Sequence, residues 1–412
     1  MSRLKYFLSA LLLILSVNVY TQLTSSPYSI FGVGIIEENS TGYNQALGGS
    51  GIALLSKKSL NSLNPASYNG IDSLNFIFET ESCFKFTSYS TNDESKKKND
   101  AGINYLAIGF RINKRWANSI GIKPYSSVDY SIQTGYYIEG ENRTYYKNFS
   151  GNGGISYLYY GNSIMLNKNI SLGINGSYFF GSITHSEIFD GNNFLRAYEF
   201  TRKVYMNTFY LDYGLLVSVP VKGMTYSAGI TYGGKKQFNS SNSYTLVLSD
   251  ETDDLEDSEN DQEYYIPENY GIGISIEKNN MLNISADYSR SRWSEVNFNN
   301  TDVKTRDGEK YSFGIEFTPS HEDKHRGFKT WTYRLGSSYN KSYLIVDDYE
   351  TSFSSFSCGL GLPLWNNKSR INISFKTGEN GTLNSGLIKE KYNIIYLNLS
   401  FQEMWFKKYK FD

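Results

Sequence analysis

The sequence predicts an all-β protein: a 14-stranded antiparallel transmembrane β-barrel with an N-terminal hatch, or plug, segment inside it. Three observations lead to this fold class. Between residues 101 and 401, stretches of ten or more residues alternate apolar and polar side chains. Short turns join these stretches in pairs, and longer polar segments follow the pairs. The chain begins with an export signal, and no apolar run of about 18 residues, the length of a transmembrane helix, follows it.

The first residues are typical of an exported protein. Arg3 and Lys5 precede an apolar run over 6–19, and we expect cleavage before Gln22, so that residues 1–21 are a signal peptide. An exported chain without a helical anchor is either soluble or a closed barrel, because lipid offers no partner to open backbone groups. A soluble β-propeller or sandwich is the alternative. The alternation favours the barrel and hence the bacterial outer membrane.

Six short turns predict six hairpins. One strand before the first hairpin and one after the last bring the total to fourteen, an even number with both ends on one side of the membrane, as single-chain bacterial barrels require. The barrel is expected to occupy residues 74–402, followed by a periplasmic tail at 403–412. The predicted turns are residues 113–115, 167–169, 219–223, 277–280, 318–328 and 362–367.

Composition agrees with a single barrel domain. No Pro-rich or Gly/Ser-rich linker divides the 412 residues. A mean hydropathy of -0.44 would suit a soluble protein, yet a barrel with a wet lumen places apolar residues only at every second position. Aromatic residues make up 16% of the chain, as expected of rings at the two membrane interfaces. A net charge of -1 argues against nucleic acid as a partner.

Alternation separates a lipid face from a lumenal face in each predicted strand. In the first strand, Glu79 and Glu81 lie opposite the phenylalanines. A Lys or Arg at mid-depth in lipid costs about 2 to 4 kcal/mol, so the charged face must be the lumen. Lipid-facing residues are expected to be Leu74, Phe76, Phe78, Phe84, Phe86, Ile170, Leu172, Ile174, Tyr178, Phe180, Ile395, Leu397, Leu399 and Phe401. Asn75, Lys85, Asn104, Asn175, Asn207 and Asp212 are expected in the lumen, as ordinary interior filling rather than a specific ligand site.

Residues 22–73, between the signal peptide and the first strand, do not alternate. They hold three stretches rich in small residues, at 26–34, 46–54 and 61–68. Glycine and other small residues allow tight turns, so this segment is expected to be a compact hatch packed inside the barrel. Its apolar side chains either line a greasy pocket or fasten the hatch to the wall, and fastening is the simpler interpretation. They are Ile30, Phe31, Val33, Leu47, Ile52, Leu54 and Leu63.

At these residues the chain resembles the FadL-type family of outer-membrane transporters for hydrophobic compounds. The stretch Leu47 to Leu54 is similar to the family's Gly-rich segment, and Asn64-Pro65-Ala66 matches its Asn-Pro-Ala box. Weaker similarities occur at residues 121–128, 153–155 and 286–294. The resemblance implies a fourteen-stranded barrel plugged by an N-terminal hatch. It further implies that hydrophobic molecules enter an outer groove and leave sideways through a gap at a kinked third strand.

The predicted third strand contains Pro124, which lies well inside a long strand pattern. Proline cannot donate to a ladder, so it must mark a bulge, bend or opening. Our hypothesis is that Lys123-Pro124-Tyr125 forms a wall break facing the hatch; the alternative is a bulge near the rim without a transport role. With the resemblance, the candidate ligand-binding residues at the hatch and the wall break are Phe31, Leu47, Ile52, Leu54, Asn64, Pro65, Ala66, Pro124 and Tyr125.

The acidic stretch from Asp250 to Glu263 is expected in a long extracellular loop. It lacks the glycine-turned spacing of an EF-hand, so a solvated loop is favoured over a metal site. Cys83 and Cys358 fall in different strands and are expected to be small packed side chains rather than a disulfide. The sequence predicts no bound metal and no cofactor.

Catalytic motifs are missing from the sequence. The chain has no Gly-x-Ser-x-Gly elbow, no His-Glu-x-x-His run and no paired-Cys spacing, so we expect no enzyme. The expected partners are outer-membrane lipid, lipopolysaccharide and small hydrophobic molecules. The alternative function is that of a non-transporting barrel subunit, a docking or scaffold protein in outer-membrane protein export or assembly. Its partners would then include other outer-membrane or export proteins.

Overall fold

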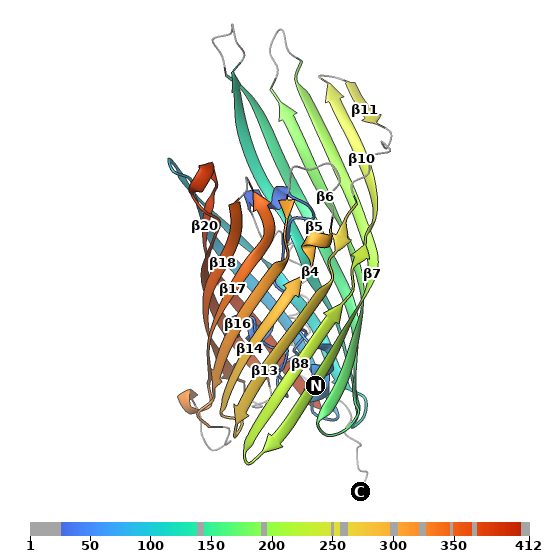
Figure 1. The fold of residues 1–412 in the computed structure, drawn as a ribbon, viewed down its shortest axis with the longest axis vertical. Coiled ribbons are helices and arrows are strands. Elements are labelled where there is room, and N and C mark those ends of the chain that lie inside the picture. Colours follow the sequence, from blue (N-terminus) through green and yellow to red (C-terminus); the bar gives the residue numbers. More distant parts are fainter. Residues whose placement is uncertain are drawn as a thin grey trace, which may run out of the picture.

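A computed structural model describes residues 26–137, 144–190, 196–248, 251–255, 263–296, 304–320, 327–346, 349–364 and 369–404. The expected signal peptide at 1–21 and most of the expected tail at 403–412 lie outside these residues. Within them, fourteen strands close into one antiparallel barrel (Figure 1). In chain order they are β2 (Asn75–Ser90), β3 (Ser95–Arg111), β4 (Trp116–Tyr137), β5 (Thr144–Met165), β6 (Ile170–Phe189), β7 (Tyr198–Val221), β8 (Met224–Gly233), β13 (Asn269–Lys278), β14 (Leu282–Ser291), β16 (Gly308–Phe317), β17 (Thr332–Val346), β18 (Tyr349–Pro363), β19 (Arg370–Asn380) and β20 (Lys389–Met404).

The first and last strands close the barrel, since β2 and β20 pair from Asn75↔Met404 to Ser90↔Lys389. Neither terminal strand of the sheet therefore presents a free edge to lipid. The six predicted hairpins and the count of fourteen are confirmed by the pairing of their strands, while residues 321–326 and 365–367 of the last two predicted turns lie outside the described residues. The strand boundaries differ slightly from expectation: Leu74 precedes β2 in a left-handed conformation with φ 66°, and β20 continues to Met404 instead of ending at 402.

The predicted faces hold with two corrections. Phe84, Leu172 and Leu397 point outward, whereas Glu79, Glu81 and Asn175 are buried inside. Asn207 does not face the lumen: it shares parity with the outward Phe209, which is 74% exposed, and Asn239 Nδ2 donates to its side chain on the outer surface. Cys358 is exposed on the outer face instead of packed, and neither it nor Cys83 forms a disulfide.

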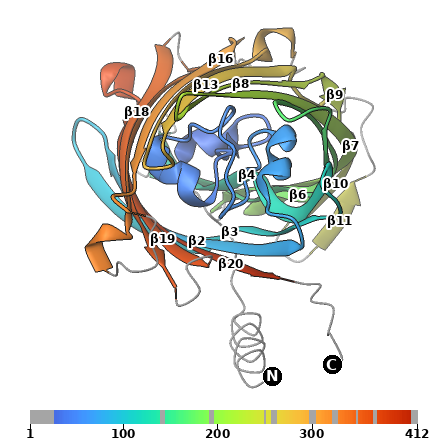
Figure 2. The same ribbon diagram turned by 90° about the horizontal axis from the view of Figure 1, so that it is seen from below.

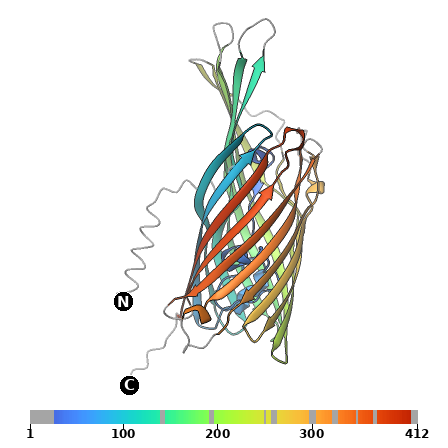
Figure 3. The ribbon, with the colours of Figure 1, turned by 90° about the vertical axis from the view of Figure 1, so that its left-hand side faces the viewer.

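The barrel wall is far taller on one side (Figures 1 and 3). Strands β4 to β7 have 20 to 24 residues, whereas β8, β13, β14 and β16 have 10 each. Above β8, the strand β10 (Asn239–Leu248) continues the tall side by pairing with β7, and β11 (Glu251–Leu255) pairs with β10. Part of the acidic stretch expected to be a solvated loop is therefore a strand, and residues 256–262 lie outside the described part. We call the upper parts of β4 to β7, together with β10 and β11, the extracellular wall.

Shorter elements complete the fold. Towards the upper end lie β9 (Lys236–Gln237), β12 (Tyr265–Ile266), β15 (Lys304–Thr305), η4 (Trp293–Glu295) and η6 (Asn384–Gly386), and at the opposite end lies η5 (Gly327–Lys329). Among the described residues, no helix combines the length and apolar character that crossing a membrane would demand.

The segment from 26 to 74 lies within the barrel, where it appears as the blue coils of Figure 2. It consists of η1 (Pro27–Ile30), β1 (Ile35–Ile36), η2 (Gly42–Leu47), η3 (Pro65–Gly70) and connecting turns. Nearly every residue from 40 to 54 is buried, although few of them are large and apolar. The hatch is therefore held mainly by polar contacts, which the next section describes.

Candidate lateral opening and lumenal cavity

The Asn-Pro-Ala segment fastens the hatch to the wall. Asn64 Oδ1 accepts a hydrogen bond from Ala66 N at 3.0 Å and so begins η3, while Asn64 Nδ2 donates to Leu215 O of β7 at 3.1 Å. The wall makes room with glycines. A Cβ on Gly214 would lie 2.0 Å from Asn64 Oδ1, and one on Gly173 would lie 2.2 Å from Ala66 N. The contacts of these residues thus fix the position of the hatch against the wall.

Carboxylates on the inner face of the wall accept hydrogen bonds from the hatch backbone. Asp287 Oδ2 of β14 receives the N–H groups of Gly51 and Ile52 at 2.6 and 2.9 Å. On β2, Glu81 Oε2 receives Gly42 N at 2.6 Å, and Glu79 Oε1 receives Leu60 N at 2.9 Å. A short coil inside a barrel has no ladder for its own N–H groups, so the wall supplies the acceptors. The inward glutamates of the first strand therefore have a structural role.

A buried ion cluster ties the hatch to a third part of the wall. Glu38 forms ion pairs with Lys376 of β19 and, at 3.1 Å, with Lys310 of β16. The Lys376 side chain is only 3% exposed. Burial by itself would raise the pKa of the Glu38 carboxyl, but the two lysines outweigh burial and hold this pKa well below its usual range. The sequence did not reveal this cluster, because alternation shows that a lysine faces inward but not which residue it meets.

The wall opens between β3 and β4. These strands share six registered pairs, from Leu106↔Ile122 to Arg111↔Ala117, whereas β4 and β5 stay paired to Tyr137↔Thr144. The ladder to β3 ends directly before Lys123, and the register of β4 against β5 shifts between Pro124 and Ser126. A proline with no N–H and a bulge thus stand where the wall separates. The predicted break at 123–125 coincides with this opening.

The start of the hatch covers the freed edge of β4. In β1, Ile35 and Ile36 pair with Ser127 and Ser126, and Glu37 N donates to Tyr125 O at 2.9 Å. Further up, Ser26 N donates to Asp129 O at 2.9 Å. We call residues 26–37 the strap. The strap thus pairs with β4 between Tyr125 and Asp129, in place of this part of the missing ladder.

A cavity of about 470 Å³ lies inside the barrel beside the strap and above the hatch. Its lining is mixed. Aromatic side chains from β4 to β7 form one flank, among them Tyr125, Tyr157, Phe179 and Tyr210. The ion cluster of Glu38, Lys310 and Lys376 lies on the opposite flank. The cavity can therefore hold a small ring against the aromatic flank while polar groups of the ligand meet charge elsewhere.

Of the nine candidate site residues from the sequence, Tyr125 lines this cavity. The others do not come together as one site. Phe31 packs against the apolar cluster around Tyr125, and Leu47 and Leu54 form a small buried cluster with Tyr43. Ile52 would collide with a Cβ on Gly229 or Gly273 and so packs tightly against the wall. Asn64, Pro65 and Ala66 anchor the hatch, and Pro124 stands at the opening.

A family model described as BamG matches residues 3–412, nearly the whole chain. The chain belongs to the BamG family. Comparison with curated proteins finds no match. Among solved structures, the BamG-family chain is similar to the toluene transporter TodX of Pseudomonas putida, with a TM-score of 0.59, 14% identity and coverage of 90% of this chain and 100% of the other.

Two further solved structures are similar to this BamG-family chain. For the Ralstonia pickettii toluene transporter TbuX, the TM-score is 0.58 at 14% identity, with 88% and 98% of the two chains covered. For a Pseudomonas aeruginosa FadL homologue, it is 0.58 at 13% identity, with 91% and 100% covered. The resemblance to FadL-type transporters noted in the sequence is thus confirmed at the level of fold. This BamG-family protein is a barrel of the bacterial outer membrane.

Proposed function

We propose that this BamG-family barrel admits small hydrophobic molecules, fatty-acid-like or aromatic, through a FadL-type lateral opening. The observation that carries the proposal is the early end of the β3–β4 ladder at Leu106↔Ile122, next to the bulge at Pro124. Ile122 is the fourth outward position of β4 above the periplasmic turn. A strand needs about ten residues to cross the membrane, so the opening begins within the bilayer and not above it.

The contacts of the hatch favour exit of a molecule through the barrel wall over exit through the periplasmic end. The hatch is bonded to β2, β7, β14, β16 and β19 through the contacts described above, so opening the periplasmic end would break many of them together. Leaving between β3 and β4 requires the strap to shift and the ion pair of Lys98 with Asp129, at 2.6 Å, to separate. A cavity of about 150 Å³ accepts benzene, and the cavity beside the strap measures about 470 Å³. The fold shared with solved structures titled toluene transporters supports the same route.

Replacing Pro124 with valine tests this route. Valine restores an N–H and favours a regular strand, so the variant is expected to narrow the opening and lower the uptake of a radiolabelled hydrophobic compound severalfold. Uptake is measured in cells or liposomes that contain equal amounts of folded barrel. Pro220→Val is the matched control, because Pro220 also lies in a strand, β7, but beside the periplasmic turn and far from the opening. Unchanged uptake by Pro124→Val would remove the proposal.

A second function, docking within an assembly, is favoured by the extracellular wall. Transport through the opening gives no reason for β4 to β7 to continue for some ten residues beyond their short neighbours. Sheet that continues above the membrane offers surface for another protein. In this case the barrel acts as a scaffold in outer-membrane protein export or assembly, its lumen sealed by the hatch.

One purification separates the two functions. The barrel is extracted from its native membrane in mild detergent, and the same preparation is examined for bound small molecules and for bound proteins by mass spectrometry. A hydrophobic small molecule in stoichiometric amount supports transport. A protein in constant ratio that disappears when the hairpin tips of the extracellular wall are shortened supports docking. If the preparation contains neither a bound small molecule nor a bound protein, both proposals are contradicted.

A further inference from the structure

A patch of aromatic and polar side chains lines the cavity on the inner face of four neighbouring strands, β5 to β8. Tyr157 is registered with Phe179, and their rings stack with centroids 4.8 Å apart and planes at 14°. Tyr210 meets Phe179 edge-on at 5.8 Å. Tyr157 and Tyr210 are only partly buried and both line the cavity, so their rings are available to a ligand ring.

Asp212 adds a carboxyl acceptor to this patch. It is the next inward residue after Tyr210 on β7, and it lines the same cavity. Its Oδ2 accepts a hydrogen bond from Asn175 Nδ2 at 2.8 Å. Its Oδ1 receives no hydrogen bond from any residue that the structure describes. A carboxylate oxygen in a nearly closed space is stabilised by a donor, and a ligand can supply one.

The nearest lysine on the patch is directed elsewhere. Lys123 of β4 is registered with Tyr157, yet its Nζ donates to Asn39 O of the hatch at 2.7 Å and to Ser62 Oγ at 2.9 Å. No ion pair joins Lys123 to Asp212 among the described residues. The patch therefore combines the Asp212 Oδ1 acceptor with aromatic faces, and the amino group of Lys123 next to it is bonded to the hatch.

We propose that Tyr157, Tyr210 and Asp212 form a binding site for small phenols. The ligand ring lies against the two tyrosines, and its hydroxyl donates to Asp212 Oδ1. This inference rests on the proposed transport function and narrows its substrate class. It excludes fatty acids from this part of the cavity, because a carboxylate would face Asp212. It also disfavours organic ammonium ions, because they would share the patch with Lys123. A neutral ring with one hydrogen-bond donor satisfies both restrictions.

Affinity measurements on the full-length barrel in detergent test the site. The probes are p-cresol and toluene, which differ by one hydroxyl, together with benzoate and benzylamine. A hydrogen bond to a charged acceptor contributes about one factor of ten, so p-cresol is expected to bind roughly tenfold more tightly than toluene and more tightly than either charged probe. In Asp212→Ala the advantage of p-cresol over toluene should vanish, while toluene affinity should change less than twofold.

Asp212→Asn provides a second variant, whose single amide oxygen keeps the acceptor for Asn175 Nδ2 and so places an N–H donor where Oδ1 stands. It is expected to reduce the preference for p-cresol over toluene to about threefold or less, because the carboxyl acceptor for the hydroxyl is lost. Heat-dependent migration on gels shows whether each variant has folded. Equal binding of p-cresol and toluene to the wild-type barrel would overturn the phenol site but leave transport of hydrophobic molecules intact. Failure of every probe to bind, toluene included, would count against transport itself. Tighter binding of benzylamine or benzoate would also overturn the site.

Discussion

The tall and short sides of the barrel use the same kind of strand for different purposes. On the short side, β13, β14 and β16 have 10 residues each, which is about the length needed to cross the membrane. On the tall side, β5 and β6 have 22 and 20 residues and continue well beyond this length. If strand length alone defined the membrane, the two sides would place its surface at different heights.

Outward side chains resolve this difference. In the lower part of the tall side, Leu158, Tyr178 and Phe209 form one registered outward row. Higher up, the outward row is Asn152, Thr184 and Lys203. Higher up, Phe149, Phe200 and Leu246 occupy inward positions, although Tyr146 and Ile188 are exposed on the outer face. The outer face thus becomes more polar above the lower row, which indicates that lipid ends between the two rows.

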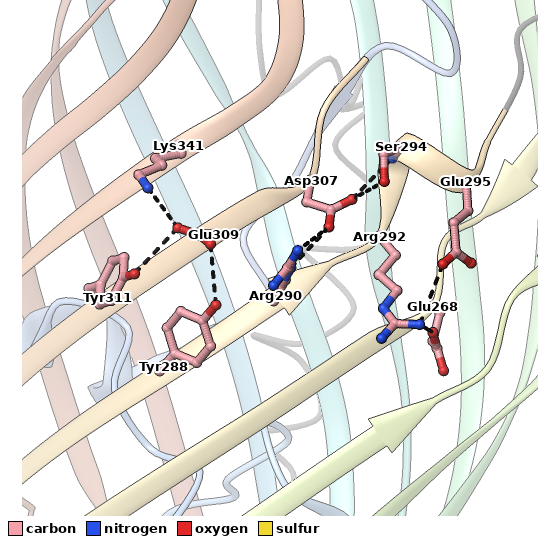
Figure 4. Close-up of polar contacts among 10 residues, drawn as sticks. All are labelled: Glu268, Tyr288, Arg290, Arg292, Ser294, Glu295, Asp307, Glu309, Tyr311 and Lys341. Atoms are coloured by element: carbon pink, nitrogen blue, oxygen red, sulfur yellow. Dashed lines mark hydrogen bonds and ion pairs between the residues drawn. The ribbon is translucent and has the colours of Figure 1, made fainter.

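The short side ends in a charged belt at its upper rim (Figure 4). Arg290 pairs with Asp307 at 2.6 Å, Arg292 with Glu268 at 2.9 Å, and Lys341 with Glu309 at 2.8 Å. Tyr288 and Tyr311 donate to Glu309, as expected of aromatic residues at the membrane interface. The outward face therefore marks the membrane boundary on both sides, by a belt on one and by more polar outward residues on the other.

The largest expected effect is the difference in stability between a lysine introduced on the lipid-facing surface and a lysine introduced on the extracellular wall. Ile274 of β13 is 58% exposed at the middle of the apolar outer face, so Ile274→Lys should lower the free energy of unfolding by about 2 to 4 kcal/mol in lipid bilayers. Asn152→Lys, on the tall side, should change it by less than about 0.5 kcal/mol, because its outward row already contains Lys203 and faces water. Denaturant unfolding in vesicles measures both. Equal losses would mean that lipid also covers the extracellular wall.

A smaller effect is expected on the inner face of the extracellular wall. Phe189 stacks between Tyr145 and Tyr198, with ring centroids 6.2 and 5.6 Å apart. Phe189→Ala should destabilise the upper wall by about 1 to 3 kcal/mol, since two ring contacts and some apolar burial are lost. Hydrogen exchange of β5, β6 and β7 amides should rise above the membrane and stay unchanged in β13 and β14. An outward control, Ser150→Ala, should leave all rates unaltered.

Much of the barrel could be predicted from the sequence because lipid imposes a simple rule. The rule fixes which side chains face lipid and which face the lumen. The outward direction of Leu172, the inward direction of Glu79 and the count of fourteen strands could therefore be predicted. The rule ceases to hold where strands leave lipid, and Asn207 was therefore assigned to the wrong face. The extracellular wall could not be anticipated from turns alone, because turns reveal neither strand length nor height.

The site was only partly predictable, for a different physical reason. Pro124 could be located because proline disrupts any ladder, and the opening lies beside it. The cluster of Glu38, Lys310 and Lys376 joins residues about 270 to 340 positions apart in sequence, and a period of two says nothing about such contacts. The hatch motif at Asn64 was recognisable, but its role as an anchor depends on glycines of the facing wall.

The smallest expected effect is a response to pH around one buried histidine of the extracellular wall. His185 of β6 faces Tyr130 of β4, whose hydroxyl is 2.8 Å from its Nδ1, and Arg202 of β7. Burial, and then the nearby Arg202, lower the pKa of His185 from 6.5 to about 4. Between these values the closed wall keeps His185 neutral, whereas a locally opened wall takes up a proton. Opening therefore becomes easier as pH falls from about 6.5 towards 4, and the stabilisation is complete above 6.5.

Hydrogen exchange at pH 7.5 and 5.0, corrected for intrinsic rates, measures this response. Protection of amides around His185 should fall at pH 5.0, whereas β8, whose only titratable side chains are two tyrosines, should keep its protection. His185→Gln retains a hydrogen-bonding side chain without a titratable ring and should abolish the difference. If the short side lost protection to the same extent, or if the glutamine variant kept the response, the pH effect would belong to the whole barrel. The two sides would then not differ in what holds them together above the membrane.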